Sequence, residues 1–190
     1  MIRPLSLALV AVALLALGAC AMEPLPAPSA TLDNIQAVRA ANIAPLAIGG
    51  FVPGPGRPTE MDKEFAVRGG IQPAPDGSFA EYLGDTLAAQ LKSAGKLDPN
   101  SALVVSGVVT DTHVDSAMPT GSAALAAKFT LIRDGKTVFE KTLRVNDTWN
   151  SDFVGAVAIP DAINHYTGLY SNLAGALFSD PDFQAAAKAQ

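Results

Sequence analysis

The spacing of apolar residues predicts one dominant helix in the middle of the chain. Ser78 and Glu81 have the S-x-x-E spacing of a capping box, which satisfies free N–H groups in the first turn of a helix. Gly95 follows, and glycine commonly ends a helix. Between these signals, apolar side chains recur at every fourth position and form one stripe: Phe79, Leu83, Leu87 and Leu91. A second long amphipathic helix is expected over roughly residues 158–178, with Pro160 in its first turn.

Extended apolar and alternating segments predict four strands, over residues 43–52, 101–116, 123–132 and 136–149. Residues 53–77 are rich in proline and glycine, and we expect an irregular loop around one short extended piece. Short helices are expected after Thr31 and after Asp180. The order strand-helix-strand-strand-strand-helix predicts an α+β fold: an antiparallel sheet of about four strands, with two main helices packed on one face. This single domain is expected to span residues 43–190.

The last two predicted strands are joined by residues 133–135, which indicate a hairpin with a three-residue loop. That loop length pairs Phe129 with Phe139 on an apolar face. It also places Lys128 beside Glu140 on the polar face. One face of the sheet is therefore expected to be covered and the other open.

The N-terminus has the pattern of an export signal. Arg3 is its only charged residue, and an apolar run follows from Leu5 to Leu17. This run is shorter than the ~20 residues of a membrane-spanning helix. The sequence Leu17-Gly18-Ala19-Cys20 closes the run and resembles the lipobox of bacterial lipoproteins. An ordinary secretory signal with a chance cysteine is the alternative.

The lipobox resemblance implies cleavage between Ala19 and Cys20, which removes residues 1–19. It also implies that Cys20 carries a diacylglyceryl group and an acylated amine, such as palmitate, and thus a membrane anchor. Ala21 is not the aspartate that resembles an inner-membrane retention signal, so we expect a location at the outer membrane, facing the periplasm. Residues 20–42 are then a lipidated N-terminus, a proline-rich tether and a short helix.

Amino-acid composition and net charge limit the classes of partner that the chain can bind. Hydrophobic residues make up 49% of the chain and charged residues 16%, which is typical of a folded domain. The net charge of -5 becomes -6 when Arg3 is lost with the signal. An acidic chain without a basic cluster is a poor binder of nucleic acid and of anionic lipid headgroups. Cys20 is the only cysteine, which excludes an intramolecular disulfide and any multi-cysteine zinc site. No cofactor is expected.

Asp111, His113 and Asp115 alternate along a predicted strand, so they point to one side. Such a set offers oxygen and nitrogen ligands to a divalent metal. Val105 and Val109 are expected on the same face, which favours a buried strand that runs out into solvent over a metal site. A contact with a partner protein is the third possibility.

Four aromatic residues near the last predicted helix are candidates for a groove. Trp149 and Phe153 lie in a polar segment before this helix, and Tyr166 and Tyr170 lie on it. Core packing explains all four. Exposure of Trp149 and Phe153 would instead indicate a partner contact. His165 falls between the apolar positions of the helix and is expected at its boundary.

A lipobox, a proline-rich tether, this order of elements and the final segment LAGALFSDPDF resemble small proteobacterial lipoproteins of the YajG-like type. More distantly, they resemble the lipoprotein auxiliaries of lipid-transport ABC systems and TolB N-terminal-like domains. The chain has no G-x-S-x-G and no phosphate-binding loop, so we expect no enzyme. The expected function is a non-enzymatic binding or assembly module of the cell envelope, with an envelope protein as partner. The alternative is a hydrophobe-binding transport auxiliary with a groove around Tyr166 and Tyr170.

Overall fold

The computed structural model describes residues 25–55 and 62–189 of the chain. Its helices are α2 (Leu32–Ala40), α4 (Phe79–Ala94), α5 (Gly155–Ser179) and α6 (Pro181–Ala187), with a short 3-10 turn η1 (Pro75–Gly77). Its strands are β1 (Ala47–Pro53), β2 (Glu64–Val67), β3 (Gly70–Pro73), β4 (Leu103–Asp115), β5 (Thr120–Arg133) and β6 (Lys136–Asn150).

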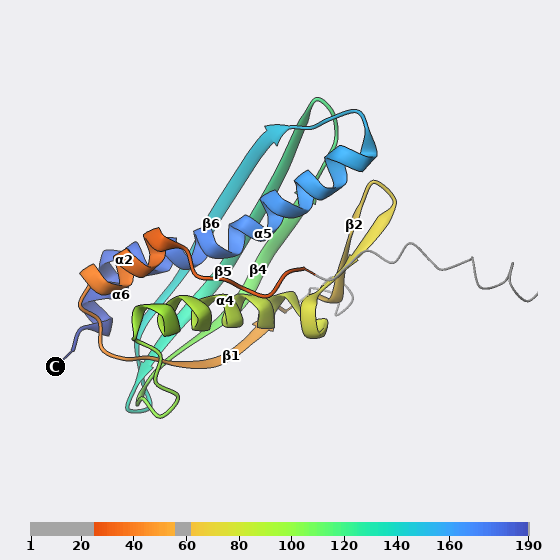
Figure 1. Cartoon of the computed structure of the whole chain (residues 1–190). Coiled ribbons are helices and arrows are strands. Elements are labelled where there is room, and N and C mark those ends of the chain that lie inside the picture. The colour runs from red at the N-terminus through yellow and green to blue at the C-terminus, as the bar shows by residue number, and fades with distance from the viewer. Residues whose placement is uncertain (1–24, 56–61, 190) are drawn as a thin grey trace, which may run out of the picture.

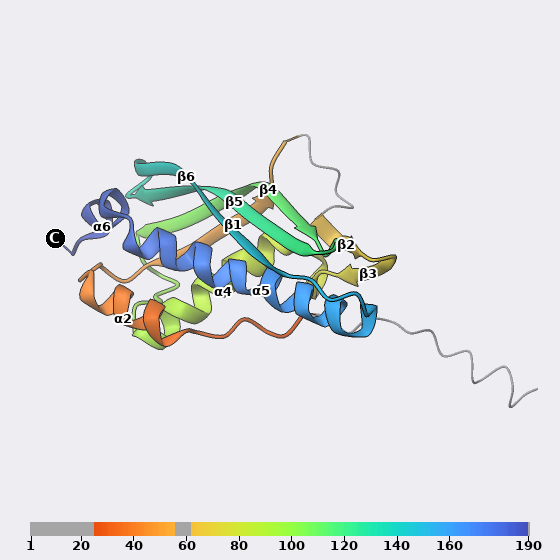
Figure 2. The ribbon, with the colours of Figure 1, turned by 90° about the horizontal axis from the view of Figure 1, so that it is seen from above.

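A four-stranded sheet in the order β1-β4-β5-β6 forms one layer of the domain. Helices α2, α4 and α5 form a second layer that covers one face of this sheet (Figures 1 and 2). Between the layers lies an apolar core that includes Leu83, Leu87, Leu125 and Phe129, all fully buried. The α+β class and the two main helices on one face are confirmed. Within the described ranges, each helix is too short or too polar to cross a bilayer.

The sheet is mixed, so the prediction of a purely antiparallel sheet is wrong. Strand β1 pairs in parallel with β4, with Phe51 opposite Gly107, whereas β4, β5 and β6 form an antiparallel meander. The physical reason is the connection between β1 and β4. It contains α4, and a helical crossover returns the chain to the end of the sheet where β1 began.

Residues 53–77 contain a hairpin of two short strands, where the sequence predicts an irregular loop around one short extended piece. Strands β2 and β3 pair antiparallel, with Val67 opposite Gly70. The two turn residues, Arg68 and Gly69, have φ values of 45° and 80°, as a two-residue primed turn requires. The hairpin is attached to the core by Phe65, whose ring centroid lies 5.5 Å from that of Phe79.

The helix ends follow the capping signals only in part. Ser78 accepts a hydrogen bond from the amide of Glu81 at 3.0 Å, and Gly95 ends α4 with a φ of 74°, as predicted. Helix α5 begins at Gly155, three residues earlier than expected. Pro160 therefore lies in the second turn of α5 and not in its first.

The hairpin between β5 and β6 has a two-residue loop, not the three-residue loop predicted. Arg133 pairs with Lys136, and the loop residues Asp134 and Gly135 have φ values of 50° and 76°. Both central residues of a type I′ turn require positive φ, and Asp-Gly is among the sequences that satisfy this.

A bulge next to this loop then moves the register by one further residue. Phe139 lies opposite Leu131 and not opposite the predicted Phe129. Along this part of β6 the observed pairing is therefore displaced by two residues from the predicted pairing. Because side chains on a strand alternate between its two faces with a period of two, each side chain keeps its predicted face. For this reason the predicted proximity of Lys128 and Glu140 is confirmed, with their charged groups 3.3 Å apart.

The segment before α2, which the sequence predicts as part of a proline-rich tether, lies against the domain. Leu25 is buried, with 5% of its surface exposed. The Tyr82 hydroxyl donates to the carbonyl of Pro26 at 3.0 Å, and the buried Gln90 side chain donates to the carbonyl of Ser29 at 3.3 Å. The chain is therefore attached to α4 from Leu25 onward.

Asp180 holds the last helix in place. One of its carboxylate oxygens accepts from the amides of Asp182 and Phe183 at 3.0 and 3.1 Å, and the other lies 2.8 Å from Nζ of Lys141. Burial raises the pKa of the Asp180 carboxyl, but the hydrogen bond from Lys141 and those from the backbone amides more than offset this effect. The pKa therefore lies below its ordinary value of 3.8.

Asp180→Asn is expected to lower the free energy of unfolding at neutral pH by about 1 kcal/mol, because the variant keeps a capping oxygen but loses the negative charge that faces the helix N-terminus and Lys141. Since the pKa of Asp180 is lower in the folded state, its stabilisation is complete above the ordinary pKa and disappears as the pH falls through the folded-state value. The difference between wild type and variant should therefore shrink below pH 3.8 in urea titrations. Asp182→Asn is the control, since 71% of that side chain is exposed. An Asp180→Asn effect that persists undiminished at low pH would contradict this assignment.

Candidate functional site

A bulge in β4 decides which of its residues face the core. Val109 lies opposite Ala127, but Asp111 lies opposite Ala126, so Thr110 is an extra residue on this strand. An extra residue in an alternating strand transfers every later side chain to the opposite face. From Asp111 onward, the odd-numbered residues leave the core face and the even-numbered residues join it.

Asp111, His113 and Asp115 therefore lie on the open face of the sheet. The prediction that they share a face with Val109 is wrong because of the bulge. The carboxylate of Asp111 forms an ion pair with Arg144 on β6. Among the residues that the structure describes, no three His, Cys, Asp or Glu side chains are grouped so as to hold a metal ion.

On one side of the far half of β4, the described residues contain no paired strand, and we call this side the free edge. Strand β1 ends at Pro53, opposite Val109, and the amide of Gly54 makes a last bond to the Val109 carbonyl at 2.8 Å. Backbone groups alternate between the two sides of a strand, and the bulge shifts this alternation by one residue. The N–H and C=O groups of Thr112 and Val114 consequently point to the side where, within the described chain, no strand pairs with β4.

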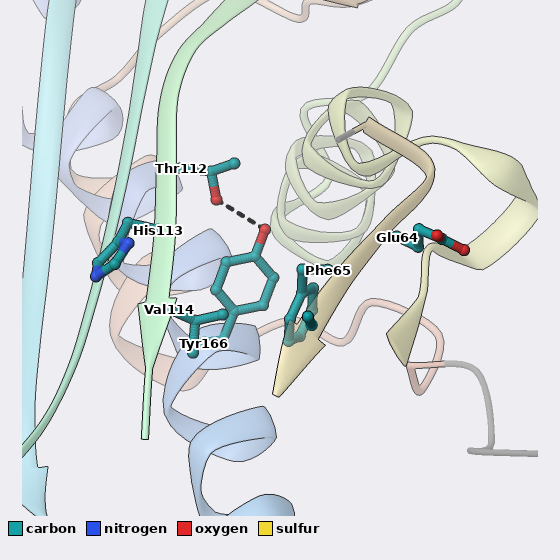
Figure 3. A pocket seen from close by; sticks show the side chains of 7 residues that line it. Glu64, Phe65, Thr112, His113, Val114 and Tyr166 are labelled. Carbon is teal, nitrogen blue, oxygen red and sulfur yellow. Dashed lines mark hydrogen bonds between the residues drawn. The ribbon is translucent and has the colours of Figure 1, made fainter. Parts of the chain in front are cut away.

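A cavity of about 240 Å³ lies between this edge and the hairpin strand β2 (Figure 3). Thr112 and Val114 point into it from β4, towards Tyr166 of α5, and Phe65 closes it from β2. His113 points to the opposite side of β4, and Glu64 points outward from β2. The lining residues are Glu64, Phe65, Ala66, Thr112, His113, Val114 and Tyr166.

Hydrogen bonds and ring packing hold the floor of the cavity together. The Tyr166 hydroxyl lies 2.8 Å from Oγ1 of Thr112 and 2.9 Å from the hydroxyl of Tyr170, and the Tyr166 and Phe65 ring centroids are 4.6 Å apart. Burial, together with the nearby Tyr166, raises the pKa of Tyr170 well above its ordinary value of 10.0. The Tyr170 hydroxyl therefore stays protonated at neutral pH and acts as a hydrogen-bond donor or acceptor, not as a base.

The groove around Tyr166 and Tyr170 that the hydrophobe-binding alternative requires is filled by packing. Each of these side chains is only 1% exposed, and the ring of Tyr170 meets that of Tyr82 edge-on, with centroids 4.9 Å apart. The cavity beside Tyr166 is smaller than the roughly 300 Å³ at which small-molecule pockets begin. This arrangement does not favour the hydrophobe-binding alternative.

Trp149 and Phe153, which the sequence grouped together, have opposite environments. Trp149 is 8% exposed, covers Gly121 and stacks on His165 with the ring centroids 4.3 Å apart, so it is a core residue. Phe153 is 80% exposed. His165 also lies 2.7 Å from a carboxylate oxygen of Asp147, a contact that sequence analysis missed because it joins two separate elements.

No protein-family model matches the chain, and no curated protein is similar to it in sequence. Among solved structures, a Xanthomonas campestris protein of the family DUF330 is similar with a TM-score of 0.49 and 17% identity, over 82% of this chain and 89% of that one. A protein from Caulobacter crescentus described as a lipoprotein is similar with a TM-score of 0.42 and 14% identity, over 56% of this chain and 85% of that one. A minor lipoprotein from Acinetobacter baumannii is similar with a TM-score of 0.43 and 12% identity, over 78% of this chain and 97% of that one. Similarity of this degree assigns neither a family nor a function to the chain.

Proposed function

We propose that the protein is an outer-membrane lipoprotein, anchored through Cys20 and facing the periplasm, whose domain binds another envelope component without catalysis. The lipobox pattern around Cys20 supports the anchor. Ala19 and Cys20 lie outside the described residues, so this part of the proposal rests on the sequence. The domain supplies the binding surface.

The free half of β4 carries the proposal. An unpaired strand edge binds an extended peptide through main-chain hydrogen bonds, and pockets beside the edge select alternate side chains of that peptide. From the register of β4, the backbone groups of Thr112 and Val114 face this edge, and both residues line the cavity. We infer that an extended segment of an envelope protein pairs with β4 and places one apolar side chain against Tyr166.

The surroundings of the edge favour a peptide over a charged ligand. The floor consists of Phe65, Val114 and Tyr166, whereas Glu64 and His113 point away from the cavity. A volume of about 240 Å³ accepts a single large side chain and excludes a whole lipid molecule. Affinity would then come from the strand pairing, and selectivity from the apolar side chain.

In-cell photo-crosslinking tests this proposal. A photoreactive residue at Ala66, which is exposed and lines the cavity, is expected to give one discrete product with an envelope protein. The same residue at Leu32, which is 67% exposed on α2, is the control and should not give this product. An absence of any product from Ala66, or the same product from both positions, would contradict binding at the β4 edge.

A further inference from the structure

An exposed apolar surface lies at one end of the molecule. It consists of Met118 in the β4–β5 loop, Phe153 and Val154 before α5, and Val157 in the first turn of α5. Their exposed fractions are 52%, 80%, 53% and 54%. We name these four residues the apolar tip. Several large apolar side chains exposed together indicate a surface that another phase or molecule covers.

The loops of the tip are held in a fixed position by Arg68, the turn residue of the β2–β3 hairpin. Its guanidinium donates to the carbonyls of Ser116 and Asp152 at 2.7 Å each and to the carbonyl of Phe153 at 3.0 Å. A further bond of 3.1 Å reaches the hydroxyl of Ser151. Phe153 is therefore presented on an ordered backbone, and its exposure does not reflect a loose loop.

The described chain begins beside the β2–β3 hairpin, whose turn residue Arg68 contacts the loops of the tip. Figures 1 and 2 place this start beside the base of the hairpin, with the C-terminus at the other end of the molecule. Side-chain contacts agree with this placement, because the carbonyl of Pro26 accepts a hydrogen bond from Tyr82 in the first turn of α4. Phe65 of the hairpin contacts Phe79 at the start of the same helix.

The distance from the domain to the proposed anchor is short. Leu25 is buried against the domain, and five residue steps separate it from Cys20. Five extended residues span at most about 18 Å. The bilayer that holds the Cys20 acyl chains must therefore lie close to Leu25 and the hairpin side of the domain, and the domain cannot move far from it.

We propose that the apolar tip enters the lipid interface of the membrane in which Cys20 is anchored. This inference rests on the proposed anchor and adds an orientation: the tip faces the bilayer, and α2 faces away. Apolar side chains at such surfaces are buried about 5–10 Å into the headgroup and acyl boundary. The attraction is apolar, because the mature chain carries a net charge of -6 and offers no basic cluster to anionic headgroups.

Tryptophan fluorescence in vesicles tests the orientation. The full lipidated chain, with Phe153→Trp or with Leu32→Trp, is reconstituted into vesicles of phosphatidylethanolamine and phosphatidylglycerol, with and without brominated acyl chains. Both positions are well exposed, at 80% and 67%, and the buried native Trp149 contributes the same background to both proteins. Contact with lipid should shift the emission of Trp at position 153 to the blue in unbrominated vesicles, and brominated chains should quench this emission. Trp at position 32 should emit as in water and should not be quenched.

Flotation of the vesicles separates the two proposals. Protein that fails to float with the lipid overturns the anchor and the tip proposal together. Protein that floats but is quenched equally weakly at positions 153 and 32 overturns the lipid contact alone, and leaves a protein partner as the occupant of the tip. Selective quenching at position 153 supports lipid contact.

Discussion

Replacing Cys20 with serine is expected to transfer the protein from the membrane fraction to the soluble periplasmic fraction. The reason is the loss of the only cysteine in the chain, which is the residue that we propose as the site of lipid attachment. Each buried CH₂ group of an acyl chain contributes ~0.8 kcal/mol to membrane binding, and two or more chains make the anchoring stable. The apolar tip cannot replace them, because it exposes only four large side chains. Fractionation of cells followed by immunodetection measures the change.

Ala21→Ser is the matched control for this experiment. It introduces the same hydroxyl one position later and leaves Cys20 in place, so the protein should remain in the membrane fraction and require detergent for extraction. If Cys20→Ser stays membrane-bound in the same proportion as wild type, the chain is held by something other than a lipid on this residue, and the anchor proposal is wrong.

The largest effect on stability is expected at Phe51, whose ring joins β1, α4 and β4. The ring occupies space left by two glycines. A Cβ atom on Gly107 would lie next to the ring, and one on Gly84 would lie 2.9 Å from it. Phe51→Ala should lower the free energy of unfolding by about 3–5 kcal/mol. Gly107→Ala should lower it by about 1–3 kcal/mol through overpacking, as measured by urea unfolding.

The double variant and a neighbouring glycine test this explanation. In a Phe51→Ala background the ring is gone, so Gly107→Ala should cost much less than in wild type. Gly50→Ala is the matched control, because no atom lies within 4 Å of a Cβ built there, and its effect should be within about 0.5 kcal/mol. If Gly107→Ala costs the same with and without the Phe51 ring, the contact is not the cause.

Local signals in the sequence predict individual elements well. Ser78, Glu81 and Gly95 mark both ends of α4 because capping depends on residues a few positions apart. The Asp134-Gly135 turn also carries its own conformational preference, although the predicted loop was one residue too long. Partners that are distant in the chain leave no such signal. The parallel pairing of β1 with β4 therefore could not be predicted from apolar patterns alone.

The candidate site shows the same limit more sharply. Thr110 looks like any other strand residue, yet the bulge there exchanges the two faces of β4 for all later residues. The sequence therefore singled out His113, which points away from the cavity, and missed Thr112 and Val114, which line it. Arg68 was missed as well, because its partners lie 48 to 85 positions further along the chain.

The central claim is that the β4 edge pairs with an extended segment, and one comparison tests it most directly. Val114→Pro removes the N–H group that we place on the free edge, and Val138→Pro makes the same change at the bulge of β6, where proline is tolerated. The Ala66 crosslink should disappear in Val114→Pro and persist in Val138→Pro, with both variants folded by circular dichroism. A crosslink that persists in folded Val114→Pro at wild-type yield would contradict binding through the β4 edge.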